Sequence, residues 1–293
     1  MLKKNKLKNK TIIITGANRG IGFELSKHFL KCGYNLILLS RSKKQNQLSK
    51  KKLLSLSHNK NNLFFQNLDI SNFREVDKFF KRILLKYKKI DILINNAGIY
   101  GPKGPIDKIS WKQLKKTIDV NLLGSIYFIK KILPHFKKNK YGRIIQLSGG
   151  GATSAFPNFS PYSISKTAIV RFVENVSKEI DKFNISINAI APGPVNTRML
   201  DEVIKAGPKK VGNKFYLKSL KQKKEGGTNI KKIVELIEFL INLNDAKING
   251  KLISAVWDNW KNYEKNKKII MNSDVGNLRR ISGKDRKLSF LDK

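Results

Sequence analysis

The sequence predicts a doubly wound α/β fold, with a single parallel sheet of about seven strands and helices on both faces. Two observations lead to this prediction. Short apolar runs alternate along the chain with longer segments whose apolar residues recur at helical spacing. The short runs are mainly apolar on both faces, which is typical of strands in a parallel sheet that helices cover on both faces.

The first half of the chain contains four such apolar runs. The expected strands are 11–15, 35–39, 63–66 and 90–94. Two amphipathic helices are expected between them, at 20–32 and 73–87. Their apolar positions are Ile21, Phe23, Leu25, Phe29 and Leu30 in the first, and Phe73, Val76, Phe79, Phe80, Ile83 and Leu84 in the second.

The second half continues the alternation. Three further strands are expected, at 142–147, 185–190 and 251–256. The helices between and before them are expected at 111–136, 162–181 and 230–243. We expect residues 1–257 to form the domain, with the polar stretch 198–228 as a lid over the strand ends and 258–293 as a charged C-terminal extension.

Composition narrows the class of protein. The chain has 293 residues, of which 40% are apolar, enough for an ordinary core. No apolar run approaches the roughly 18 residues that span a bilayer. The basic start is followed only by the short apolar run 11–15, too short for an export signal. We therefore expect a cytoplasmic protein without a membrane partner.

The chain carries a large positive charge, with 60 basic and 21 acidic residues and a formal net charge of +39. Such a charge invites a nucleic-acid interpretation. However, lysine supplies most of it and is spread along the whole chain. We interpret the charge as a lysine-rich surface and expect no nucleic-acid partner; a polyanion-binding role and a small basic substrate site remain the alternatives.

Cys32 is the only cysteine, and His28, His58 and His135 are scattered along the sequence. A single cysteine excludes an internal disulfide and argues against a cysteine-based zinc site. The sequence therefore predicts no metal.

A glycine-rich loop connects the first strand to the first helix. In its sequence TGANRGIG, Gly16 permits a tight turn, Gly20 lets the backbone approach a pyrophosphate, and Gly22 allows close helix–strand packing. The helix N-terminus then faces the anion, which predicts a Rossmann-type dinucleotide site. Its spacing is not that of an ATP-binding P-loop.

The residues after the second strand bear on the choice of cofactor. Ser40-Arg41-Ser42 holds no acid to bind a ribose 2′-hydroxyl. Arg41, joined by Arg19, can instead pair with a 2′-phosphate. The sequence therefore favours NADP (NADPH) over NAD.

Tyr162 and Lys166 are four residues apart at the start of a predicted helix, so they share one face. A phenol is a poor acid–base group at neutral pH, but a neighbouring ammonium favours the phenolate. The pair can then deliver or remove a proton during hydride transfer.

At this point the sequence resembles the short-chain dehydrogenase/reductase family, over residues 10–256. The motifs follow in family order: the glycine loop, Asp69, Asn95-Asn96-Ala97-Gly98, Asn121, Ser148, Tyr162 with Lys166, and the run from Pro192 to Thr197. The resemblance implies that Tyr162 is the general acid/base, supported by Lys166. It further implies that Ser148 binds the substrate oxygen and that Asn121 holds a water linking Lys166 to solvent. The residues implied or expected to bind the cofactor are Gly16, Asn18, Arg19, Gly20, Ile21, Gly22, Ser40, Arg41, Asp69, Asn95, Ala97, Gly98, Lys166, Pro192, Gly193, Val195 and Thr197.

Two features depart from the family pattern. The serine usually lies thirteen residues before the tyrosine, a position that Gly149 occupies here, whereas Ser148 lies fourteen before Tyr162. We interpret the run Gly149-Gly150-Gly151 as a one-residue insertion that leaves Ser148 in the role, with Ser154 as a weaker candidate. The extension 258–293 is also atypical; it either covers a pocket or packs loosely.

The implied reaction is hydride transfer between the nicotinamide and a ketone or secondary alcohol. Lysines of the lid could select an anionic substrate, or they could belong to the general lysine enrichment. The resemblance implies a homodimer or homotetramer. Two other functions remain open: a nucleotide-sugar epimerase or dehydratase, against which Arg19 argues because it replaces a glycine of that loop pattern, and a catalytically silent, cofactor-sensing binding protein.

Overall fold

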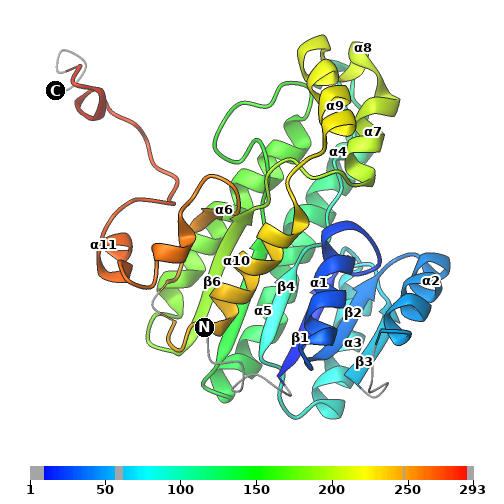
Figure 1. Cartoon of the computed structure of the whole chain (residues 1–293), viewed down its shortest axis with the longest axis vertical. Helices are drawn as coiled ribbons and strands as arrows, with labels where there is room; N and C mark the ends of the chain where they lie inside the picture. The colour runs from blue at the N-terminus through cyan, green and yellow to red at the C-terminus, as the bar shows by residue number, and fades with distance from the viewer. Residues whose placement is uncertain (1–9, 57–61, 247, 289–293) are drawn as a thin grey trace.

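Seven strands form one parallel sheet within residues 10–56, 62–246 and 248–288, the part of the chain that the computed structural model describes (Figure 1). Most of the basic N-terminal segment, and His58, lie outside these residues. The strands are β1 (Thr11–Thr15), β2 (Asn35–Ser40), β3 (Leu63–Asn67), β4 (Ile92–Asn95), β5 (Gly142–Leu147), β6 (Ile185–Ala191) and β7 (Leu252–Ser254). Their order in the sheet is β3-β2-β1-β4-β5-β6-β7, and all neighbours pair in parallel. The predicted fold class is confirmed.

Helices cover both faces of this sheet. The longer ones are α1 (Gly20–Lys31), α2 (Lys43–Leu54), α3 (Phe73–Lys86), α4 (Trp111–Ile118), α5 (Gly124–Lys138), α6 (Ser160–Glu179), α7 (Arg198–Ala206), α9 (Asn213–Glu225) and α10 (Ile230–Asn242). Short helical turns are η2 (Ile106–Lys108), the π-helical η3 (Asp119–Leu123), α8 (Pro208–Val211), η4 (Trp260–Asn262), α11 (Lys267–Met271) and η5 (Lys284–Arg286).

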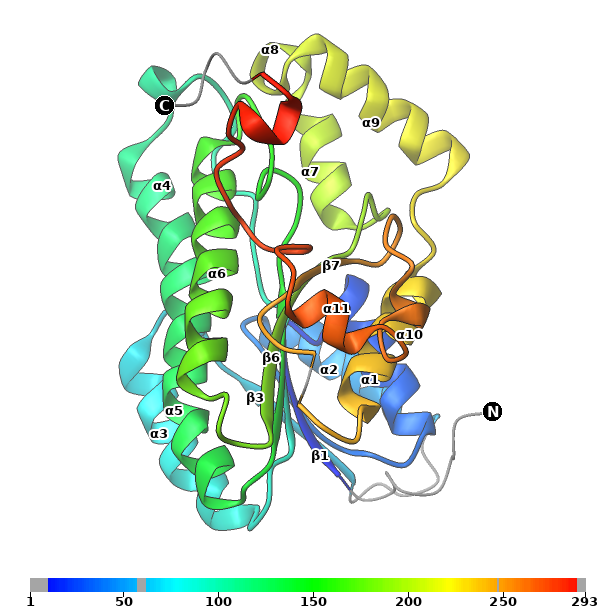
Figure 2. The same cartoon turned by 90° about the vertical axis from the view of Figure 1, so that its left-hand side faces the viewer.

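The core has two layers, one on each face of the sheet, as the edge-on view shows (Figure 2). Side chains from α1, α2 and α10 form one buried cluster, and side chains from α3, α5 and α6 form the other. Alternate residues of β1 enter different layers: Ile12 and Ile14 face the first cluster, and Ile13 faces the second. This alternation is why the strand is apolar throughout.

The chain reverses its winding direction between β1 and β4, which are neighbours in the sheet. In doubly wound sheets, ligands bind at the carboxyl ends of the strands at this switch point. The glycine-rich loop follows β1, and the Asn95-Asn96 pair ends and follows β4. The fold therefore places both motifs at the crevice where a cofactor site is expected.

Three parts of the fold differ from the sequence prediction. The single helix expected over 111–136 consists of α4 and α5 joined by the π-helical turn η3. The helix α2 was not expected, because its segment is largely polar and buries only Asn46, Ser49 and Leu53. The stretch 198–228 forms the helices α7, α8 and α9, which lie together beyond the ends of the strands (Figure 1).

The described part of the C-terminal extension packs along β7 and α6. The amide of Leu252 in β7 donates to Gly276 O at 2.7 Å, and the amide of Leu278 donates to Glu174 Oε1 of α6 at 2.6 Å. Trp260 is buried in the first core cluster beside Phe239. Among the described residues, no helix combines the length and the apolar character needed to span a membrane.

Candidate active site

The glycine-rich loop after β1 packs against the chain that follows β4. Gly16 has a φ of +66°, and a Cβ atom there would lie 2.9 Å from Ala97 Cα. A Cβ atom at Gly22 would lie 2.3 Å from Gly16 O. Asn96 Nδ2 donates to the carbonyl oxygens of Thr15 and Gly16 at 3.0 and 3.1 Å. These contacts leave room for backbone alone and hold the loop in one shape.

This loop borders a cleft of about 610 Å³ at the switch point of the sheet. The cleft brings together most of the residues predicted to bind a cofactor. Those that line it are Gly16, Asn18, Arg19, Gly20, Ile21, Ser40, Arg41, Asp69, Ala97, Gly98 and Thr197. Those that do not line it are Gly22, Asn95, Lys166, Pro192, Gly193 and Val195.

Positive charge gathers where the cleft meets β2. Arg41 Nη1 lies 3.5 Å from Asp69 Oδ2, and Asp69 Oδ1 accepts bonds from the amide and hydroxyl of Ser71. Burial lowers the pKa of the Arg19 guanidinium, the charges of Arg198 and Arg41 lower it further, and Glu202 opposes them. Arg19, Arg41 and Arg198 therefore create a local positive field at the cleft wall.

Asn46 of α2 holds two of the predicted cofactor residues. Asn18 Nδ2 donates to Asn46 Oδ1 at 2.8 Å, and the hydroxyl of Ser40 donates to the same oxygen. The buried Asn46 also donates to the carbonyl oxygen of Ser40 at 3.0 Å. Asn46 thus fixes the ends of the glycine loop and of β2 relative to each other.

Tyr162 and Lys166 lie on the same face of α6, and both are buried. Lys166 Nζ donates to the carbonyl oxygen of Leu147, at the end of β5, at 2.8 Å, and lies 5.6 Å from the centre of the Tyr162 ring. Burial lowers the pKa of the Lys166 ammonium to about 8. Burial, and to a lesser extent Tyr100, raises the pKa of the Tyr162 phenol. The pair is therefore dry and electrostatically sensitive, a common property of reactive groups.

Asn121 is held in place by the π-helical turn between α4 and α5. It exchanges two hydrogen bonds with the backbone of Ile99, at 2.9 and 2.8 Å, and its Nδ2 lies 3.1 Å from Ser165 Oγ of α6. A Cβ atom at Gly98 would contact both Asn121 Oδ1, at 3.4 Å, and Lys166 Nζ, at 3.7 Å. π-Helical turns often occur at functional sites, and this one brings Asn121 and Lys166 together behind Gly98, which lines the cleft.

Ser148 and Gly149 face different partners. The hydroxyl of Ser148 donates to the backbone carbonyl oxygen of Lys166 at 3.4 Å. A Cβ atom at Gly149 would lie 2.3 Å from Tyr162 Oη. In this conformation the residue thirteen before the tyrosine is thus the one directed at the phenol. The substrate-binding role of Ser148 remains a prediction.

The run from Pro192 to Thr197 supports the cleft more than it lines it. Gly193 has a φ of +78°, and a Cβ atom there would collide with Thr228 and Val256 at 2.6 Å. Thr197 caps α7 by accepting a bond from the amide of Met199, and it also lines the cleft. Asn95 is buried and donates to Ser125 O of α5 at 3.1 Å, so it holds β4 to that helix.

Aromatic residues from three segments surround Tyr162. Its ring lies 4.7 Å from that of Tyr100, and Phe159 stacks on Phe156 at 4.3 Å. Phe215 of the lid contacts both of these phenylalanines edge-on, at 5.0 and 5.3 Å. The lid lysines are all exposed, namely Lys205, Lys209, Lys210, Lys214, Lys218, Lys221, Lys223 and Lys224. The inner surface of the lid is therefore apolar at Phe215, and its exposed outer surface carries the lysines.

Several residues of the site were not singled out from the sequence. Arg198, Met199 and Glu202 line the cleft because α7 packs across it. Tyr100, which follows the Asn95-Asn96-Ala97-Gly98 motif closely, reaches Tyr162. Arg198 directly follows Thr197, a predicted cofactor residue, so its charge was a sequence signal for a role at the cleft. Its position over the cleft, however, depends on how the lid folds.

Comparisons with known proteins agree with this arrangement. A model of the short chain dehydrogenase family matches residues 10–207. Oxidoreductase UcpA of Salmonella typhimurium is 34% identical over 199 residues, covering 68% of this chain and 74% of the relative. The uncharacterized oxidoreductase C162.03 of Schizosaccharomyces pombe is 32% identical over 189 residues, covering 64% of this chain and only 61% of the relative.

A solved structure described as ElxO with NADP bound superposes with a TM-score of 0.70 at 27% identity. The match covers 84% of this chain and 96% of that one. The family match spans well over half of the chain, and UcpA is covered over more than two thirds of its length. The chain therefore belongs to the short-chain dehydrogenase family of oxidoreductases.

Proposed function

We propose that the chain transfers a hydride reversibly between NADP and a ketone or secondary alcohol. The observation that carries this proposal is the buried Tyr162–Lys166 pair, next to the Gly98 wall of the cleft. A phenol and an ammonium held together without water can exchange a proton with a substrate oxygen. The family membership supports the same chemistry.

The cleft suits a dinucleotide with a 2′-phosphate. The packing of Gly16 and Gly22 keeps side chains out of the loop, so backbone N–H groups at the start of α1 are open to a pyrophosphate. Arg41 and Arg19 supply cationic donors where the 2′-phosphate is expected, and Arg198 adds a third charge. The NADP-bound relative ElxO supports this preference.

When bound, NADP supplies or accepts the hydride. In the reducing direction, the carbonyl carbon of the substrate accepts the hydride while Tyr162 Oη donates its proton to the carbonyl oxygen. The Lys166 ammonium stabilises the phenolate that remains, which offsets the burial that raises the pKa of Tyr162. Leu147 O holds Lys166 Nζ in place at 2.8 Å, and Asn121 fixes the adjoining wall.

The surroundings of Tyr162 favour a substrate with apolar or aromatic surface. Tyr100 contacts the Tyr162 ring, and Phe159 and Phe215 belong to the same apolar cluster, so a substrate that reaches the phenol meets apolar surface. The lysines of the lid are exposed on its outer side, where they can meet an anionic group only at the rim. We therefore propose aryl or bulky alkyl ketones as the first substrates to test.

The test is a screen of aryl, cyclic and aliphatic ketones, following NADPH consumption by absorbance. Tyr162→Phe removes only the proposed proton donor and should lower turnover by about 10²–10⁴-fold while NADPH binding is retained. Tyr87→Phe is a matched control, because Tyr87 follows α3 and does not line the cleft. It should leave turnover unchanged.

Two outcomes would contradict the proposal. Undiminished turnover in Tyr162→Phe would exclude the proton-transfer mechanism. NADPH binding without reduction of any ketone would instead favour a cofactor-sensing binding protein.

A further inference from the structure

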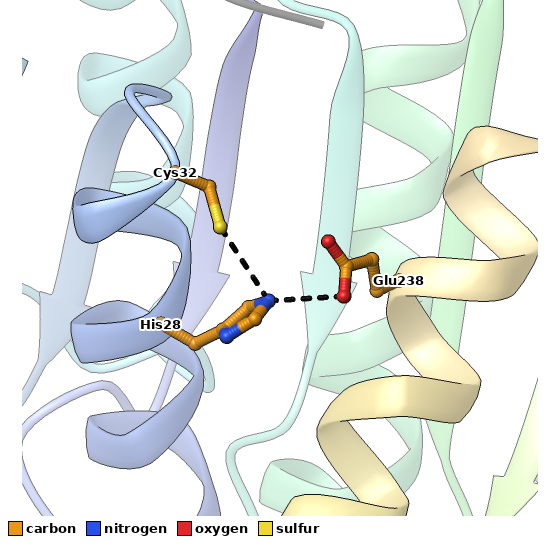
Figure 3. A group of neighbouring side chains, drawn as sticks. All are labelled: His28, Cys32 and Glu238. Atoms are coloured by element: carbon orange, nitrogen blue, oxygen red, sulfur yellow. Dashed lines mark hydrogen bonds and ion pairs between the residues drawn. The ribbon is translucent and has the colours of Figure 1, made fainter. Parts of the chain in front are cut away.

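Three side chains with metal-binding atoms converge between α1 and α10, away from the cleft (Figure 3). His28 Nε2 lies 3.2 Å from Glu238 Oε2 and 3.7 Å from Cys32 Sγ. The three atoms all lie within 4.8 Å of one another. None of these residues takes part in the proposed reaction.

The helices fix where these groups lie. His28 and Cys32 are four residues apart at the C-terminal end of α1, so both face the same way, and the amide of Cys32 donates to His28 O. Glu238 comes from α10, which packs against α1 through Leu25, Phe29 and Ile237 of the first core cluster. Ligands that project from packed helices keep a more exact geometry than ligands on loops.

The distances match two edges of a zinc coordination tetrahedron. Bonds of about 2.0–2.3 Å at tetrahedral angles place a ligand nitrogen about 3.3 Å from a ligand oxygen and about 3.6 Å from a ligand sulfur. The observed distances from His28 Nε2 are 3.2 and 3.7 Å. The third edge, between Cys32 Sγ and the Glu238 carboxylate, is no longer than 4.8 Å.

Proton counting also favours a cation between these groups. Both contacts involve the same atom, His28 Nε2, and an imidazole nitrogen carries at most one hydrogen. Shared between Glu238 and Cys32, that hydrogen makes only a weak three-centre contact. A metal ion can accept lone pairs from the nitrogen, a thiolate and a carboxylate at once.

The group is also accessible. The side chains of His28 and Glu238 are 32% and 34% exposed, which gives a metal ion a path from solvent and leaves room for water as a fourth ligand. One imidazole, one thiolate and one carboxylate suit zinc or a similar borderline divalent ion better than magnesium or calcium.

We propose that His28, Cys32 and Glu238 bind one divalent zinc-type cation that ties α1 to α10. From the sequence alone, the single cysteine argued against a metal site. The fold, however, places beside Cys32 a histidine from the same helix face and a glutamate from a helix distant in the sequence. The glycine loop begins the same helix, about 12 Å along its axis from His28. The cation would therefore brace the helix that carries the cofactor loop, without touching substrate.

The experiment uses the full chain without an affinity tag, freed of metal by chelation and then titrated with Zn²⁺ by calorimetry. We expect one Zn²⁺ per chain, with affinity at least tenfold weaker in Cys32→Ser and in Glu238→Gln. Glu235→Gln is the matched control, because Glu235 lies on the same helix in an ion pair with Lys231 and should bind Zn²⁺ as the wild type does.

Titration with Co²⁺ gives a second readout that does not depend on activity. A thiolate ligand gives Co²⁺ a charge-transfer absorption band, which should be present in the wild-type chain and absent in Cys32→Ser. Circular dichroism checks that each variant is folded. The proposal is overturned if the folded wild-type chain binds no stoichiometric metal, or if binding persists unchanged in Cys32→Ser or Glu238→Gln.

Discussion

Gly149 faces the phenol of Tyr162 so closely that a Cβ atom there would lie 2.3 Å from Tyr162 Oη. In the family pattern this position, thirteen residues before the tyrosine, carries the serine. The hydroxyl of Ser148 bonds instead to the backbone of Lys166, at 3.4 Å. The loop after β5 thus brings a residue without a side chain to the reacting phenol.

This relationship leads to opposite expectations for two alanine variants. Gly149→Ala should lower turnover at least about tenfold, since its methyl group displaces Tyr162 Oη from the reactive position. Ser148→Ala should lower it less than about threefold, because it removes only a long hydrogen bond. Steady-state kinetics with the best ketone of the screen measures both. A loss of about a hundredfold in Ser148→Ala would instead support the substrate-binding role that the sequence predicts for it.

Arg41 is expected to discriminate between the two nicotinamide cofactors. Replacing Arg41 with alanine removes a charge-assisted contact with the 2′-phosphate, which should raise the KM for NADPH about tenfold or more and leave that for NADH nearly unchanged. Arg82→Gln is the control, because Arg82 lies on α3 and bonds to Gln66 of β3. An equal change in both KM values would contradict the assignment of the 2′-phosphate to Arg41.

The sequence was informative where local chemistry decides the structure. The seven mainly apolar runs predicted the sheet because strands buried on both faces have few polar positions. The glycine loop and the spacing of Tyr162 and Lys166 carried enough chemistry to predict a cofactor cleft with a proton donor beside it. Both features depend on residues that are close together in the chain.

Features that depend on distant contacts were not predictable. The helix α2 is polar, and its buried Asn46 acts through Asn18 and Ser40, which belong to other segments. The inward orientation of Phe215 depends on how the lid packs against Phe156 and Phe159. Spacing alone could not show which of Ser148 and Gly149 faces the tyrosine, because the direction of the loop decides it.

The buried ammonium of Lys166 should make the stability of the protein depend on pH. Burial lowers the pKa of Lys166 to about 8, whereas the unfolded chain keeps this lysine protonated to about pH 10.4. Between these values the unfolded state binds more protons, so the free energy of unfolding should rise with pH. The slope approaches about 1.4 kcal/mol per pH unit and vanishes below pH 8.

Denaturant unfolding of the wild type and Lys166→Met at pH 7, 8.5 and 9.5 measures this effect. The wild type should gain stability relative to the variant as the pH rises. The matched variant Lys218→Met removes an exposed lysine, so its difference from the wild type should stay constant. A constant difference for Lys166→Met as well would mean that the ammonium is not buried in solution.

Phe215 is expected to contribute to substrate binding through the apolar inner surface of the lid. Phe215→Ala removes the ring that packs on Phe156 and Phe159, and should raise the KM for an aryl ketone about tenfold, the effect of losing one apolar contact of about 1–3 kcal/mol. Lys218→Ala, an exposed position on the same helix, is the control and should change the KM for aryl ketones little. If Lys218→Ala raised the KM more than Phe215→Ala, the basic outer surface would be the selective one.

The C-terminal extension should stabilise the domain through Trp260. The Trp260 side chain is only 7% exposed and contacts Phe239 of α10 at 5.5 Å between ring centres, whereas Trp257, three residues earlier, is 72% exposed. Trp260→Ala should therefore lower the free energy of unfolding by about 3 kcal/mol through the lost burial and the cavity left behind. Trp257→Ala should change it by less than about 0.5 kcal/mol. Urea unfolding followed by circular dichroism compares the two, and equal effects would show that the extension packs loosely on the domain.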